Sequence, residues 1–141
     1  MKISEELIDR IKEHEGFKEY SYNDQLGIPT IGYGFKISEL TLTKEISSLI
    51  LRKKLGEIIS SLPLYINWFA YTSISIQEVL IEMAYQMGIQ GLLNFKKTLS
   101  YLEDEEYKKA AKEMLDSKWY KQTPNRAIRL SNIVAKCEED L

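Results

Sequence analysis

Apolar residues recur at helical spacing near the start of the chain, which predicts an amphipathic helix over residues 4–15. Ser4 is placed to cap this helix, and the acidic residues after it suit the positive end of the helix dipole. Gly16 can adopt the left-handed conformation in which many helices end. Glu15 is therefore expected at the junction between a helix and a loop.

A different pattern follows in residues 17–37, where aromatic and β-branched residues are interrupted by glycines. Such residues favour strands, and the run NDQLG at residues 23–27 has the composition of a turn. We expect a small antiparallel sheet of two or three short strands. The glycines predict bulges or a close approach of the backbone to another group.

From residue 42 onward the apolar spacing is helical. Thr43 can cap a helix that runs to about Ser61 and that Pro63 ends. A predominantly helical α+β fold follows from this helical remainder and the small sheet before it.

Later helices are marked by their start signals. Ser75 and Glu78 form a capping box before a central helix, Tyr107 lies in another helix, and Thr123 with Pro124 starts the last one. Trp119, Met83 and Met87 are expected in the core. The apolar positions on the inner faces of the central and last helices are Val79, Leu80, Met83, Ala84, Met87, Ala127, Leu130, Val134 and Cys137.

The composition, 44% hydrophobic and 28% charged, is that of a globular protein, and the net charge is −2. Nucleic-acid-binding proteins usually carry a basic surplus, so we expect no nucleic-acid partner. A single cysteine excludes an internal disulfide, and with a single histidine no zinc site is expected. A basic run does occur at residues 118–129. It is either a solvated surface, the commoner case, or a patch that faces an anionic partner.

Three polar residues in the first part of the chain have the types needed to cleave an acetal. That reaction requires a proton donor at the leaving oxygen and a second polar group that activates water or stabilises the cationic centre. Glu15 closes a helix, Asp24 lies in a turn, and Thr30 follows on the next strand. Alone this is a weak signal, because the chain has 21 acidic residues and aspartate is common in turns.

The sequence around these residues is more specific. The runs HEGF at 14–17, YNDQLG at 22–27 and TIGYG at 30–34 resemble the N-terminal signature of phage-type (T4-like) lysozymes. MAYQMG at 83–88 and WYKQTPNRA at 119–127 resemble two later segments of the same family. These motifs are separate and follow one another in the family's order from residue 14 to residue 127, so the resemblance covers nearly the whole chain.

The resemblance implies one lysozyme domain, 1–141, with a two-lobed fold. A small β-containing lobe is expected at about 16–60, and a helical lobe at about 61–141 together with the helix at 4–15. A long helix would join the lobes, with the substrate cleft between them.

The resemblance also implies an inverting glycoside hydrolase. Its substrate would be the glycan strand of bacterial peptidoglycan, cut between N-acetylmuramic acid and N-acetylglucosamine. By this analogy Glu15 is the general acid, Asp24 activates or positions the water, and Thr30 orients it. No cofactor and no metal are implied.

Five further residues match substrate-binding positions of the family. Arg126 matches an arginine that lies near the catalytic glutamate, whereas Tyr85, Gln86 and Thr98 align with residues that line the cleft. Lys36 falls at another such position with a different residue type. A structural role is as well supported for Tyr85 and Gln86 as substrate binding: they could serve helix packing and the polar rim.

The chain departs from the family in three respects. The segment 36–43 is short, Phe35 replaces a histidine, and the acidic balance is unusual for enzymes that act on an anionic wall. Two other functions stay open: a lytic transglycosylase, and a non-catalytic wall-binding or phage structural module. The full set of Glu15, Asp24 and Thr30 argues against both.

The first residues lack the apolar stretch of a secretory signal, and no apolar run could span a bilayer. We therefore expect a monomer that is made in the host bacterial cytoplasm and does not insert stably into membranes. It would reach the wall after release through a holin pore.

Overall fold

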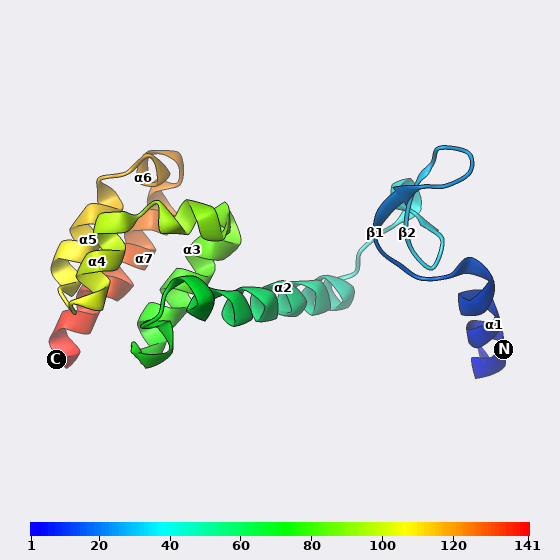
Figure 1. Ribbon diagram of the computed structural model, residues 1–141, viewed down its shortest axis with the longest axis horizontal. Coiled ribbons are helices and arrows are strands. Elements are labelled where there is room, and N and C mark those ends of the chain that lie inside the picture. Colours follow the sequence, from blue (N-terminus) through cyan, green and yellow to red (C-terminus); the bar gives the residue numbers. More distant parts are fainter. The chain divides into compact units, whose positions relative to one another are not determined.

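The computed structural model describes all 141 residues and consists of two compact units, Met1–Ser47 and Ser48–Leu141 (Figure 1). The predominantly helical α+β class is confirmed. Whether the helix at 4–15 belongs to the helical lobe stays a prediction. The elements of the first unit are α1 (Glu5–Glu15), β1 (Lys18–Asn23), β2 (Pro29–Gly32), β3 (Phe35–Lys36) and a 3-10 turn η1 (Ile37–Glu39).

Helix α2 (Lys44–Tyr65) begins in the first unit and continues into the second. The rest of the second unit is helical. Its elements are η2 (Phe69–Tyr71), α3 (Ile74–Leu93), α4 (Lys96–Glu103), α5 (Tyr107–Leu115), α6 (Lys118–Gln122), α7 (Pro124–Lys136) and η3 (Cys137–Asp140).

Helix α1 forms and ends as the sequence predicts. The Ser4 hydroxyl accepts a hydrogen bond from the Leu7 amide at 3.2 Å, which satisfies one of the free amides of the first turn. Gly16 has φ +69°, and its amide donates to the Lys12 carbonyl at 2.9 Å. The helix therefore stops directly after Glu15.

The sheet has three antiparallel strands in the order β1-β2-β3, as expected. In its register, Thr30 on β2 lies opposite Tyr22 on β1 and Lys36 on β3. The pairing of β1 with β2 shifts its register between Lys18 and Tyr22. Thr30 thus occupies the central strand and is 3% exposed.

Helix α2 runs further than predicted. Thr43 caps it, with its hydroxyl accepting from the Ile46 amide at 3.2 Å. The expectation that Pro63 ends it was wrong, since the helix continues to Tyr65. A proline at this position removes only the amide donor to the Ile59 carbonyl, one hydrogen bond close to the end of the helix. The i to i−4 pattern resumes after it, since the Ile66 amide donates to the Leu62 carbonyl at 2.8 Å.

Helix α3 starts at a different cap from the predicted one. The Ser73 hydroxyl, not that of Ser75, accepts from the Ile76 amide at 3.3 Å. Gly88 interrupts the helix with φ +79° and ψ 161°, after which a last helical turn follows. The buried residues of α3 carry much of the core of the second unit.

That core is built from all the helices of the second unit. Trp119 is 6% exposed, and its ring packs edge-on against Phe95 with the centroids 5.8 Å apart. Helices α4 and α6 were not predicted as separate elements, because eight and five residues show too little periodicity. The largest fully buried side chains are Leu62, Ile76, Leu80, Met83, Leu92, Leu102 and Met114. None of the helices has the length and apolar character needed to cross a bilayer.

Candidate active site

Glu15, the predicted general acid, is the last residue of α1, and its side chain is exposed to solvent. The carboxylate lies directly on the backbone of Gly34, between β2 and β3. A Cβ atom added to Gly34 would come within 3.0 Å of the Glu15 Cδ and closer still to its Oε2. Gly34 also has φ +74°, so two independent reasons favour glycine there. Together with α1, the β2–β3 turn therefore sets the place of Glu15.

Asp24, the predicted water-activating residue, lies in the turn between β1 and β2 and uses one oxygen to hold that turn. Its Oδ1 accepts from the Leu26 amide at 2.8 Å and from the Ile28 amide at 2.9 Å. Its backbone carbonyl accepts from Gly27 at 2.9 Å. The second carboxylate oxygen, Oδ2, has no hydrogen-bond partner in the structure and is available to a ligand.

Thr30, the predicted water-orienting residue, is joined to Asp24 through a single peptide group. The Thr30 hydroxyl donates to the Ile28 carbonyl at 2.8 Å, and the Asp24 amide donates to the same carbonyl at 3.0 Å. Because the Ile28 amide donates to the Asp24 side chain, Ile28 fixes both polar residues. Sequence reasoning missed Ile28, whose role lies entirely in its backbone.

The sheet also places Lys36, which lies on β3 opposite Thr30 and is exposed. The first unit thus holds four of the predicted residues. Asp24, Thr30 and Lys36 are linked by strand pairing and by the Ile28 peptide, and Glu15 is linked to the sheet through Gly34.

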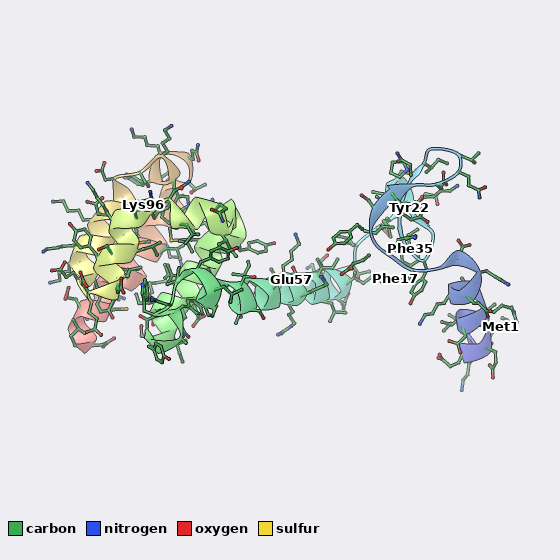
Figure 2. All side chains as sticks on the ribbon, viewed as in Figure 1. Met1, Phe17, Tyr22, Phe35, Glu57 and Lys96 are labelled. Atoms are coloured by element: carbon green, nitrogen blue, oxygen red, sulfur yellow. The ribbon has the colours of Figure 1, made fainter.

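An aromatic cluster beside Glu15 was missed. The rings of Phe17 and Tyr33 are 5.3 Å apart between centroids, and those of Tyr33 and Phe35 are 6.3 Å apart, edge to face. The Lys12 ammonium lies 5.3 Å from the centroid of Tyr33. Figure 2 labels Phe17 and Phe35 on this unit. Aromatic residues on both sides of Gly34 were the signal that could have indicated the cluster.

The second unit holds the other predicted residues, and it brings two of them together. Tyr85, which is 43% exposed, and Arg126 line one open groove of about 500 Å³ over α2, α3 and α7. Its lining includes the apolar side chains of Leu55 and Ile81. In the groove the Arg126 Nε donates to the Glu82 carboxylate at 2.7 Å. This partner, 44 residues away in sequence, could not be read from any local pattern.

Gln86 and Thr98 lie elsewhere in the same unit. Gln86 accepts from the Trp119 indole at 2.9 Å and donates to the Thr123 hydroxyl at 3.4 Å, so its side chain serves the packing of α3 against α6. Thr98 is 3% exposed and lines a separate open cavity of about 520 Å³ with Trp119. Thr123 precedes α7 as predicted, but its hydroxyl donates to the Trp119 carbonyl instead of capping the helix.

Two buried groups of the second unit have raised pKa values. Burial raises the pKa of the Tyr107 phenol and of the Cys137 thiol above their usual values. No group of three or more His, Cys, Asp or Glu side chains is placed to hold a metal ion.

Comparison with known proteins gives a consistent result. Residues 12–136 match the family described as phage lysozyme. Probable T4-type lysozyme 1 of Dictyostelium discoideum is 28% identical, over 89% of this chain and 91% of that protein. The pre-baseplate central spike protein Gp5 of Enterobacteria phage T4 is 27% identical over 91% of this chain, which spans 27% of the length of Gp5.

Proposed function

The chain belongs to the phage lysozyme family, and we propose that it is an inverting muramidase. It hydrolyses the β-1,4 bond between N-acetylmuramic acid and N-acetylglucosamine in bacterial peptidoglycan. The observation that carries the proposal is the family match over residues 12–136, which includes Glu15, Asp24 and Thr30. The hydrogen bonds around Asp24 and Thr30 support the assignment of their roles.

Glu15 acts as the general acid in this proposal. Its carboxyl group donates a proton to the glycosidic oxygen as the bond to the anomeric carbon breaks, and the leaving sugar departs as a neutral alcohol. A proton donor needs a defined position and access to the substrate. Glu15 has both, because it is exposed and its carboxylate lies on the backbone of Gly34.

Asp24 and Thr30 hold the attacking water. The Thr30 hydroxyl already donates its proton to Ile28, so towards water it can only accept a hydrogen bond. The free Oδ2 of Asp24 is likewise an acceptor. A water molecule that donates one hydrogen bond to each of these oxygens directs a lone pair at the anomeric carbon. When this water attacks, Asp24 takes up the proton that it releases.

Hydrolysis differs from the transglycosylase reaction in its product. In the latter the 6-hydroxyl of muramic acid attacks and leaves a 1,6-anhydro end, for which no water-binding pair is needed. We expect reducing ends of inverted, α configuration, detected by NMR during digestion of glycan strands. A 1,6-anhydro product would exclude hydrolysis, and a β-configured reducing end would exclude inversion.

Tyr85 and Arg126 are proposed to contact the glycan from their shared groove. The exposed Tyr85 ring offers a face for a sugar, and the Arg126 guanidinium has donors beyond the Nε that binds Glu82. Lys36, Gln86 and Thr98 stay predictions as substrate-binding residues.

The test of the general acid is the clearing of purified peptidoglycan by wild type and by Glu15→Gln. Glutamine has nearly the same shape but no transferable proton, so we expect clearing to slow by about 10²- to 10⁴-fold. Glu13→Gln, an exposed carboxylate on the same helix, is the matched control and should clear at the wild-type rate. If Glu15→Gln clears as fast as Glu13→Gln, the assignment of Glu15 is wrong.

A second candidate is a phage structural module that binds the wall without cleaving it. The match to the spike protein Gp5, over 91% of this chain, is the observation that favours it. The same clearing assay separates the two functions, because a binding module sediments with peptidoglycan but releases no reducing ends.

A further inference from the structure

We propose that Tyr33 is a positioning residue for Glu15, holding the last turn of α1 against the β2–β3 turn through Lys12 and Phe17. The inference rests on the proposed function, since it assigns Tyr33 a role through the general acid. It adds a residue that does not touch the reacting atoms.

Within the first unit, no buried core joins helix α1 to the sheet, so its attachment there rests on surface contacts. None of its residues is buried in the structure, so hydrophobic burial does not fix its orientation on the sheet. The contacts that join its C-terminal end to the sheet converge on Tyr33 and its neighbour Gly34. Small changes at this point therefore move Glu15.

Two side chains contact the Tyr33 ring from the α1 side. The Lys12 ammonium lies 5.3 Å from the ring centroid, within the range of a cation–π interaction. The Phe17 ring lies 5.3 Å away, tilted by 47°. Lys12 lies three residues before Glu15, and Phe17 lies two residues after it. Tyr33 therefore contacts the chain on both sides of Glu15.

The sheet holds Tyr33 in turn. Phe35 packs edge to face on Tyr33, and its ring covers Gly32, where an added Cβ would meet it at 2.7 Å. Gly34, the residue on which the Glu15 carboxylate lies, directly follows Tyr33. The same ring thus orders the surface under the carboxylate and the helix end that carries it.

The test compares Tyr33→Leu with Tyr33→Phe on soluble glycan strands. Leucine removes the ring, and a shift of the general acid by about 1 Å costs up to about 10²-fold in rate. We expect kcat to fall about 10- to 100-fold with KM changed less than about twofold. Tyr33→Phe keeps the ring and should retain kcat. Tyr20→Leu, at an exposed tyrosine of the same sheet, is the matched control and should behave as wild type.

Lys12, the cation that contacts the Tyr33 ring, is exposed, so substituting it is an independent test. Lys12→Gln should lower kcat about 3- to 10-fold, and Lys12→Arg should restore it because the cation is kept. In the double variant with Tyr33→Leu, Lys12→Gln should cost nothing further, since its partner ring is gone. Multiplicative losses would show that the two residues act separately and would overturn the proposal.

Other outcomes separate this inference from the proposed function. If Glu15→Gln is inactive while Tyr33→Leu keeps full kcat, only the role of Tyr33 is wrong. If Tyr33→Leu raises KM alone, the ring binds substrate and the positioning role fails. If Glu15→Gln is fully active, the proposed function itself fails.

Discussion

Asp24 has a structural role in the turn and a proposed chemical role in the reaction. Its Oδ1 holds the β1–β2 turn through two amides, and its Oδ2 stays free. The interpretation of Asp24 as a turn residue and its interpretation as a catalytic residue were alternatives in the sequence. In the structure Oδ1 serves the turn, and the proposed catalytic role falls to Oδ2, so substitutions can separate the two.

We expect the free energy of unfolding of Asp24→Asn to lie within about 0.5 kcal/mol of the wild-type value. The asparagine side-chain oxygen can accept hydrogen bonds from the same two amides. Asp24→Ala loses both acceptors and should be destabilised by about 1–3 kcal/mol. Both variants should be nearly inactive, since neither carries the charge that takes up a proton from water. Urea unfolding and clearing assays measure the two effects. An active Asp24→Asn would show that the charge is not needed.

At the scale of elements, Gln86 links helices that are distant in sequence. Its carbonyl oxygen is the acceptor for the buried Trp119 indole, and its amide reaches Thr123. A buried hydrogen-bond donor that lacks an acceptor lowers the free energy of unfolding. The Gln86 side chain therefore contributes more to the stability of the contact between α3 and α6 than its partial exposure indicates.

Gln86→Leu should lower the free energy of unfolding by about 1–3 kcal/mol, because the Trp119 indole loses its acceptor. Gln86→Glu keeps an oxygen acceptor and should cost less. Gln90→Leu, an exposed glutamine on the same helix, is the control and should stay within about 0.5 kcal/mol. Equal unfolding midpoints for Gln86→Leu and Gln90→Leu would contradict the structural role of Gln86.

The two groups with raised pKa values affect the stability of the molecule as a whole. Cys137 and Tyr107 are 6% and 5% exposed, and burial disfavours their ionised forms. The folded state therefore holds their protons to higher pH than the unfolded chain does. Their contribution to stability is complete below the usual pKa values of 9.0 and 10.0 and is lost as the pH rises through the raised values.

We accordingly expect the free energy of unfolding to fall with increasing slope above about pH 9. Urea unfolding between pH 7 and pH 10.5, with reductant present, measures this slope. Tyr107→Phe and Cys137→Ala should each flatten the decline, since each removes one of the titrating groups. If the free energy of unfolding falls as steeply with pH in the double variant as in wild type, other residues cause the decline.

Much of the local structure was predictable because it depends on neighbours in sequence. The capping of α1 by Ser4, its end at Gly16 and the short strands around the turn at Asp24 were all correctly predicted. The wrong predictions concerned the ends of helices. Ser73, and not Ser75, caps α3. Helix α2 continues beyond Pro63 because the hydrogen bond that the proline removes lies in the last turn.

By itself, then, the sequence determined the family, the fold class and the identity of Glu15, Asp24 and Thr30 as candidates, since ordered motifs and periodicity are properties of the chain alone. Only the tertiary structure decided what each candidate touches. The contacts of Glu15 with Gly34 and of Arg126 with Glu82 join residues far apart in sequence. No local propensity encodes such contacts, because they arise only when separate elements pack.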